Sequence, residues 1–178
     1  MWRPGFSYLS KHVGKLYGYH RALCIYSYVH RGTPEKPGLV FGLDRGGSCT
    51  GIAFEVDGRL HDEVMAYLRA REQVTSVYQE SHHHITLNDG RHISAVAYTV
   101  DRNHEQYAGV LSDEKRFQLV KHGVGQSGKN PDYILSTYAH LKELGLNDAP
   151  LARLLKHLHD DPYEQDQASS SSSPSLKE

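Results

Sequence analysis

The segment YLRARE, residues 67–72, lies where a predicted helix meets a predicted strand. Leu60, Val64 and Tyr67 recur at spacings of three and four residues, which predicts an amphipathic helix over residues 59–71. The run at 82–87 alternates between polar and apolar side chains, as a half-buried strand does. The pattern therefore places one carboxylate, that of Glu72, at the end of a helix and just before a strand.

Further strands are predicted on both sides of this helix. The run at 18–29 is rich in aromatic and aliphatic side chains, and shorter apolar runs follow at 39–43 and 49–56. Between these two lies DRGGS, residues 44–48, which is typical of a glycine-rich hairpin turn. Asn88-Asp89-Gly90 predicts a second hairpin, whose return strand covers residues 92–100.

The character of the chain changes to helical from Ser112 onward. Ser112 offers a partial N-cap, and a second helix is predicted to have Asn130 as its N-cap and Pro131 at its first position. That helix is expected to stop before Gly145, a C′ glycine, and a last helix covers residues 149–159. Strands first and helices later predict an α+β fold.

Length and composition set the domain organisation and exclude some partners. We expect one domain over residues 1–162 and a disordered, serine-rich tail over 163–178. The formal net charge of −1 argues against a nucleic-acid partner. The chain has neither the roughly 18 apolar residues of a membrane helix nor a signal peptide, so we expect no membrane partner and a cytoplasmic location. Cys24 and Cys49 lie in apolar runs and are expected to be small buried residues.

Three stretches of the sequence occur in the order found in a known family. HRGTPEKPG (residues 30–38), YLRARE (67–72) and GQSGKNPDY (125–133) together resemble the ChaC-type γ-glutamylcyclotransferases, which cut the γ-glutamyl bond of glutathione. The segment at 101–109 also resembles that family, and the resemblance runs from Met1 to about His159. It implies an α+β fold with a small mixed β-barrel and flanking helices, and a lyase whose partner is a small molecule, glutathione.

The resemblance assigns the catalytic role to Glu72. In cyclotransfer the α-amine of the substrate attacks its own γ-carbonyl, which forms 5-oxoproline and releases Cys-Gly. A carboxylate within reach of both nitrogen atoms can take the proton from the amine and give it to the leaving nitrogen. From the residues alone, the alternative is that Glu72 is a solvated helix-end residue paired with Arg71 or Arg69.

Four further residues are candidates for substrate binding. Ser127 and Gly128 lie in a loop that enters a helix, where free backbone N–H groups favour a carboxylate. Tyr133 corresponds to a tyrosine in the family's active site. Arg31 can pair with a substrate carboxylate, and its loop is stiffened by two prolines. The alternatives are an ordinary helix cap with a packed tyrosine, and a surface loop with a solvated arginine.

We expect neither a metal nor a cofactor. His82, His83 and His84 lie in a predicted strand, so only His82 and His84 share a face and can supply two ligands at most. The cyclotransfer reaction itself calls for no water, metal or cofactor.

The family's chain begins with a short strand and a Tyr-Gly-Ser-Leu loop, and this sequence begins at the Met-Trp that follows that loop. We therefore expect the chain as written to be less stable than a longer form and its γ-glutamyl pocket to be open. Three explanations remain: the natural protein is longer, a short form has lost activity, or another segment completes the pocket. Two functions follow: a glutathione-degrading enzyme, or a non-catalytic γ-glutamyl-binding or interaction protein. A cyclotransferase for another γ-glutamyl compound is a further alternative, and the oligomeric state is not set by the sequence.

Overall fold

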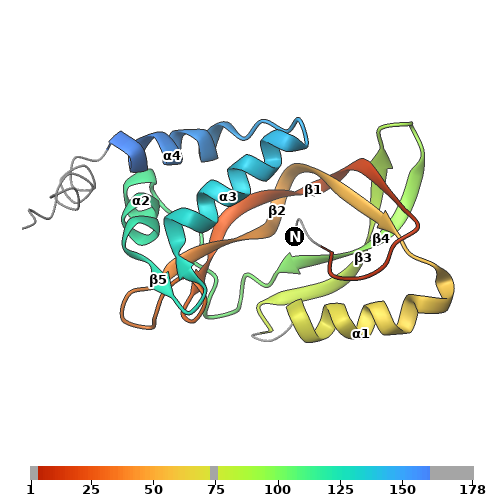
Figure 1. Cartoon of the computed structure of the whole chain (residues 1–178), viewed down its shortest axis with the longest axis horizontal. Helices are drawn as coiled ribbons and strands as arrows, with labels where there is room; N and C mark the ends of the chain where they lie inside the picture. Colours follow the sequence, from red (N-terminus) through yellow and green to blue (C-terminus); the bar gives the residue numbers. More distant parts are fainter. Residues whose placement is uncertain (1–3, 73–75, 161–178) are drawn as a thin grey trace, which may run out of the picture.

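The computed structural model of the chain describes residues 4–72 and 76–160 (Figure 1). The expected tail at 163–178 lies outside these ranges, so its disorder stays a prediction. The elements, in chain order, are β1 (Ser10–Ser27), β2 (Gly38–Glu55), a one-turn 3-10 helix (Gly58–Leu60), α1 (His61–Glu72), β3 (Tyr78–Leu87), β4 (His92–Val100), α2 (Asp113–His122), β5 (Val124–Gly125), β6 (Gly128–Lys129), α3 (Asn130–Glu143) and α4 (Ala149–Asp160).

The described strands form one four-stranded sheet, in the order β2-β1-β3-β4, and a small hairpin of β5 and β6. Strands and helices together confirm the α+β class. Every pairing between described strands is antiparallel, whereas the resemblance implied a mixed barrel. The sheet curls, since a Cβ built on Gly42 of β2 would lie 2.3 Å from Val100 Cγ2 of β4. The two outer strands therefore pack against each other.

The predicted hairpin turn at residues 44–48 is wrong. These residues continue β2, which pairs with β1 from Ser10↔Glu55 to Ser27↔Gly38. The register shifts between Tyr17↔Ser48 and Tyr19↔Arg45, so β2 carries one extra residue there, as in a β-bulge. Gly46 and Gly47 both have positive φ (105° and 66°), a conformation that glycine adopts without steric cost. The glycines therefore bend a long strand rather than end it.

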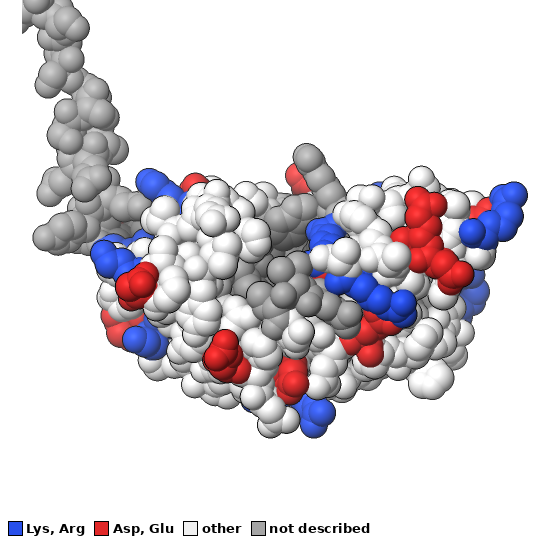
Figure 2. All heavy atoms as spheres, turned by 90° about the horizontal axis from the view of Figure 1, so that it is seen from below, with Lys and Arg blue, Asp and Glu red and all other residues white. Residues whose placement is uncertain are grey.

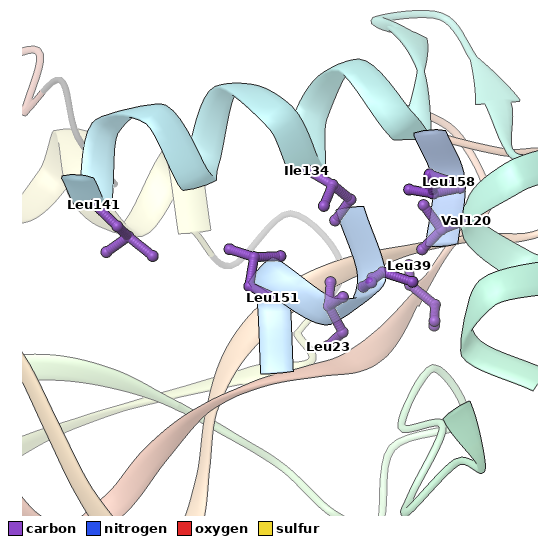
Figure 3. Close-up of a cluster of buried hydrophobic side chains, with 8 residues drawn as sticks. Leu23, Leu39, Val120, Ile134, Leu141, Leu151 and Leu158 are labelled. Carbon is purple, nitrogen blue, oxygen red and sulfur yellow. The ribbon is translucent and has the colours of Figure 1, made fainter. Parts of the chain in front are cut away.

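The helices gather at two places along the β1–β2 ribbon (Figure 1). Helices α2, α3 and α4 lie together at one end, and α1 runs beneath β3 and β4 at the other. The first group closes a core in which apolar side chains of the ribbon meet those of the helices (Figure 3). Its buried members are Leu23, Leu39, Val120, Ile134, Leu141, Leu151, Leu154 and Leu158. None of the described helices combines the length and apolar character needed to cross a bilayer.

Most of the predicted helix boundaries hold within two residues, but the predicted N-cap of α3 is wrong. Asn130 is the first residue of the helix, and its side chain makes no cap. It is fully buried and reaches β2 instead, where its Oδ1 accepts from Leu39 N–H (2.6 Å) and its Nδ2 donates to Leu39 O (2.8 Å). Its amide therefore pairs with the backbone of β2 as a neighbouring strand would. Gly145 follows α3 with a φ of 69°, as expected.

A buried carboxylate ties β2 to the loop after β4. The side chain of Asp44 is 6% exposed, and Arg102 Nε donates to its Oδ1 (2.7 Å) while Tyr107 Oη donates to its Oδ2 (3.0 Å). Burial raises the pKa of this carboxyl, but the hydrogen bonds from Arg102, Tyr107 and the Arg45 N–H outweigh burial and hold the pKa below its usual value. The folded state therefore favours the charged form of Asp44.

This network predicts a pH-dependent effect of Asp44→Asn. Because the pKa is lower in the folded state, ionised Asp44 stabilises the fold above its unfolded-state pKa of about 3.9, and this stabilisation is lost as the pH falls through the folded-state value. We expect Asp44→Asn to lower the free energy of unfolding by about 1–3 kcal/mol at pH 7, and the difference from wild type to shrink below about pH 4. Urea titrations from pH 2.5 to 7 measure this.

Asp89→Asn is the control, because Asp89 also ionises more readily in the fold through Arg91, but in an exposed turn where solvent screens the pair, so its effect on stability should be small at every pH. A difference between Asp44→Asn and wild type that stays constant from pH 7 to pH 2.5 would contradict the charged role of Asp44.

Candidate active site

Glu72 is the last residue of α1, and its side chain is 20% exposed. Arg71 Nε lies 3.3 Å from Glu72 Oε1, so one of the two arginines named as alternative partners does pair with it. Arg69 pairs instead with Glu80 of β3, to which its Nη2 donates at 2.8 Å. Figure 2 shows acidic and basic side chains lying next to one another on the face where α1 lies. The Glu72 carboxylate is thus largely shielded, with one arginine beside it.

Two tyrosine hydroxyls bond to the backbone of one residue of β2. Tyr78, the first residue of β3, donates from its Oη to Phe41 O (3.0 Å). Tyr133, in the first turn of α3, accepts a hydrogen bond at its Oη from Phe41 N–H (3.2 Å). The rings of Tyr133 and Phe41 pack with their centroids 5.9 Å apart. The backbone of Phe41 therefore brings together side chains from β3 and α3.

Glu72 acts electrostatically on one of these hydroxyls, that of Tyr78. Burial raises the pKa of Tyr78, and the nearby Tyr133 and Glu72 raise it further. Burial also raises the pKa of Tyr133, against the opposing effects of the Phe41 N–H and Arg31. Both phenols therefore stay protonated at neutral pH. Glu72, Tyr78 and Tyr133 form the group that we call the carboxylate–tyrosine cluster.

Arg31 covers the Tyr133 side of this cluster. Its guanidinium carbon lies 5.3 Å from the centre of the Tyr133 ring, and its Nη1 donates to Ser127 O (2.6 Å) and Lys129 O (3.2 Å). A cation over an aromatic face is held by the ring quadrupole. Arg31 is thus more ordered than a solvated loop arginine, since it links the 28–37 loop to the start of α3.

Two glycines from other segments pack so closely against the backbone of Arg31 that a side chain would not fit at either position. A Cβ on Gly38 would lie 2.1 Å from Arg31 O, and a Cβ on Gly123 would lie 2.6 Å from the same oxygen. Both distances are far below a van der Waals contact, so glycine is required at these crossings. This packing fixes the backbone from which the Arg31 side chain extends.

Ser127 and Gly128 lie in the β5–β6 hairpin, beside the loop that carries Arg31. Ser127 N–H donates to His30 O (3.0 Å), and Ser127 Oγ lies 2.9 Å from His30 Nδ1. The N–H of Asn130 donates to Gly123 O (2.8 Å). The backbone N–H groups of Ser127 and Asn130, in the loop predicted to bind a substrate carboxylate, are therefore hydrogen-bonded within the protein. The structure places Ser127 O against Arg31 and the Ser127 side chain against His30.

Two surface hollows of the described part of the chain lie away from this cluster. One, of about 350 Å³, is lined by Tyr26, Tyr28 and neighbours from the 34–37 loop and α2. The other, of about 360 Å³, lies between residues 5–7 and the first turns of α1. Neither is lined by Glu72, and residues 73–75, which follow Glu72, lie outside the described ranges. The described residues contain no group of three His, Cys, Asp or Glu side chains placed to hold a metal ion.

The sequence matches the family described as "ChaC-like protein" over residues 1–161. The chain belongs to the ChaC-like family. It is 30% identical to the glutathione-specific γ-glutamylcyclotransferase of Escherichia coli over 87% of this chain and 67% of that protein. It is 31% identical to glutathione-specific γ-glutamylcyclotransferase 1 of Mus musculus over 76% of this chain and 62% of that protein. The chain thus spans about two thirds of the length of these ChaC-like relatives.

A solved structure supports the fold expected for a ChaC-like chain. The yeast γ-glutamyl cyclotransferase specific to glutathione superposes with a TM-score of 0.76 over 85% of this chain and 88% of that one, at 19% sequence identity. The γ-glutamylcyclotransferase-like fold is therefore confirmed.

The sequence pattern does not reveal the positions of two residues: Tyr78 of the carboxylate–tyrosine cluster, and Asn130, which joins α3 to β2. Tyr78 was missed because the strand was predicted to start at His82, four residues after the start of β3. The aromatic side chain four residues before that run is the signal that would have extended the strand. The pattern around Asn130 predicts a cap, because its bonds to Leu39 span a separation of 91 residues that no local pattern reveals.

Proposed function

We propose that this chain is a γ-glutamylcyclotransferase that converts glutathione to 5-oxoproline and Cys-Gly. The observation that carries the proposal is Glu72, a shielded carboxylate at the end of α1 whose charge raises the pKa of the buried Tyr78. The E. coli and mouse relatives carry the name of this activity, and the chain shares their family.

The reaction needs one group that moves a proton between two nitrogen atoms. The α-ammonium group of the substrate gives a proton to Glu72 and becomes a nucleophilic amine. The amine attacks the γ-carbonyl carbon, and Glu72 gives the proton to the amide nitrogen as the amide C–N bond breaks. The ring nitrogen then loses its second proton to Glu72, which passes it to the released amine of Cys-Gly. Because nucleophile and carbonyl belong to one molecule, holding the chain in a folded conformation supplies much of the rate. No electrons are transferred and no water is consumed, so the chemistry calls for no cofactor.

The remaining candidate residues are proposed to bind and orient the substrate. The hydroxyls of Tyr133 and Tyr78, which both bond to the backbone of Phe41, are proposed to provide polar contacts for the γ-glutamyl group. Arg31, over the Tyr133 ring, is proposed to attract a substrate carboxylate. Ser127 and Gly128 are proposed to shape the same edge of the site through the hairpin that Arg31 holds.

The cytoplasm is proposed as the place of action. Cys24 and Cys49 are free thiols, as in proteins of reducing compartments. Burial raises the pKa of the Cys24 thiol to about 12, with the Asp44 carboxylate adding to the shift, so that thiol is unreactive.

A direct assay tests the proposed activity. Purified protein is incubated with glutathione, and both 5-oxoproline and Cys-Gly are followed by mass spectrometry. The assay uses this chain and a form extended upstream by the family's strand and Tyr-Gly-Ser-Leu loop. We expect at least one of the two forms to release 5-oxoproline and Cys-Gly in a one-to-one ratio. Two folded forms without turnover of glutathione would contradict the proposal, and γ-glutamyl amino acids and amines are the next substrates to try.

Tyr133→Phe is expected to weaken substrate binding more than it slows the chemistry. The change removes only the hydroxyl of the cluster and leaves the ring under Arg31. We expect the KM for glutathione to rise about threefold to tenfold, the effect of one lost hydrogen bond, with a smaller change in kcat. Tyr138→Phe on the same helix is the control, because that ring packs against the apolar core. An unchanged KM in Tyr133→Phe would leave Tyr133 a structural role alone.

A further inference from the structure

The segment of residues 4–9 lies against α1 and β2 and is anchored at several points. A Cβ on Gly5 would lie 2.0 Å from Tyr67 Oη, so the segment touches α1 there without a side chain between them. The Phe6 ring meets the edge of Tyr67 with centroids 6.3 Å apart. At the other end, Leu9 N–H donates to Glu55 O (2.7 Å) and thereby attaches the segment to the end of β2.

Arg71 connects this segment to Glu72. Its Nη1 donates to Pro4 O (3.1 Å) and to Tyr67 Oη (3.3 Å), while its Nε lies 3.3 Å from Glu72 Oε1. Tyr67 and Arg71 are four residues apart and therefore share one face of α1. A single guanidinium thus contacts the backbone of the N-terminal segment, a neighbouring hydroxyl and the carboxylate of the cluster.

We propose that Arg71 is a positioning residue, which fixes the carboxylate of Glu72 by anchoring it to the segment of residues 4–9. The planar guanidinium presents its donors in fixed directions, so its bonds to Pro4 O and Tyr67 Oη set the direction of its contact with Glu72. The expected effect on kcat rests on the proposed function, because the orientation of Glu72 affects the rate only if Glu72 transfers protons.

The test compares Arg71→Ala and Arg71→Lys with wild type, and Arg59→Ala is the control. Arg59 carries the same charge just before α1 and, within the described residues, pairs with Asp57 alone. We expect Arg71→Ala to lower kcat for glutathione about tenfold to 100-fold, the effect of misplacing a catalytic group by about 1 Å, with KM within twofold of wild type. Lysine keeps the charge but not the fixed geometry, so Arg71→Lys should recover part of kcat. Arg59→Ala should match wild type.

Hydrogen exchange supplies a readout that does not depend on activity. In Arg71→Ala the amides of residues 5–9 should exchange at least about threefold faster, while those of β3 and β4 stay as in wild type. Unchanged exchange in residues 5–9 would overturn the anchor, even if wild type proved inactive on glutathione and the proposed function failed. Faster exchange with an unchanged kcat would overturn the positioning of Glu72. A raised KM with normal kcat would also overturn the positioning role, because Arg71 would then contact the substrate.

Discussion

Glu72→Gln is expected to lower kcat for glutathione by at least about 100-fold, the scale of general acid–base catalysis, while the protein stays folded. Glutamine preserves the size of the side chain and can still accept a hydrogen bond, but it cannot take the proton from the substrate ammonium. The side chain lies at the end of α1 beside Arg71, so the change removes one ion pair at a helix end, which the fold is expected to tolerate. Steady-state production of 5-oxoproline and a thermal melt measure the two quantities.

Glu63→Gln is the matched control for this change. Glu63 lies in the first turn of the same helix and is exposed, so it tests whether removal of any carboxylate from α1 slows the enzyme. Its kcat should stay within about twofold of wild type. Glu72→Asp adds a test of distance, because it keeps the charge and withdraws the carboxylate by one methylene. Near-normal kcat in Glu72→Gln would remove Glu72 from the catalytic role and with it the proposed mechanism.

The parts of the fold that the sequence predicts are those set by local pattern. The helix expected at 59–71 appears as a 3-10 turn followed by α1 at His61–Glu72, and the hairpin at Asn88-Asp89-Gly90 joins β3 to β4. Each depends on periodicity or turn chemistry within a few residues. The glycines at 46 and 47 show the limit of such patterns. The same residues suit a turn or a bulge, and only the pairing of β2 with β1 along its whole length decides between them.

The candidate site also combines features that follow from the sequence with features that depend on the tertiary fold. The role of Glu72 came from the resemblance to a family, and its contact with Arg71 follows from their adjacency in α1. The grouping of Tyr78 with Tyr133 depends on Phe41, which lies on a third element, β2. The sequence singles out Arg31 as a ligand for a substrate carboxylate, while its bonds to Ser127 O and Lys129 O arise from a crossing between distant segments. Contacts of this kind depend on the tertiary fold, so a single sequence does not reveal them.

Asn130→Ala is expected to be the most destabilising of the changes considered. Its side-chain amide is fully buried and bonds both the N–H and the C=O of Leu39, a residue in the centre of the helical core. Alanine leaves both backbone groups without these partners, and each unsatisfied buried group costs about 1–3 kcal/mol. We expect the free energy of unfolding to fall by about 3 kcal/mol or more, which corresponds to a Tm lower by roughly 6–12 °C for a domain of this size.

Two further variants separate the hydrogen bonds from the volume of the side chain. Asn130→Leu fills the space but still removes both bonds, so it should lose nearly as much stability as Asn130→Ala. Asn147→Ala is the control, because Asn147 is exposed between α3 and α4, and its Tm should stay within about 2 °C of wild type. A mild effect of Asn130→Leu beside a severe effect of Asn130→Ala would show that filling the core matters here more than pairing with β2. Tyr133 lies one turn further along α3, and its hydroxyl bonds to Phe41 of β2. Without the Asn130 bonds, this helix would no longer be fixed to the neighbouring residues of β2. We therefore expect a higher KM for glutathione in any Asn130 variant that remains folded.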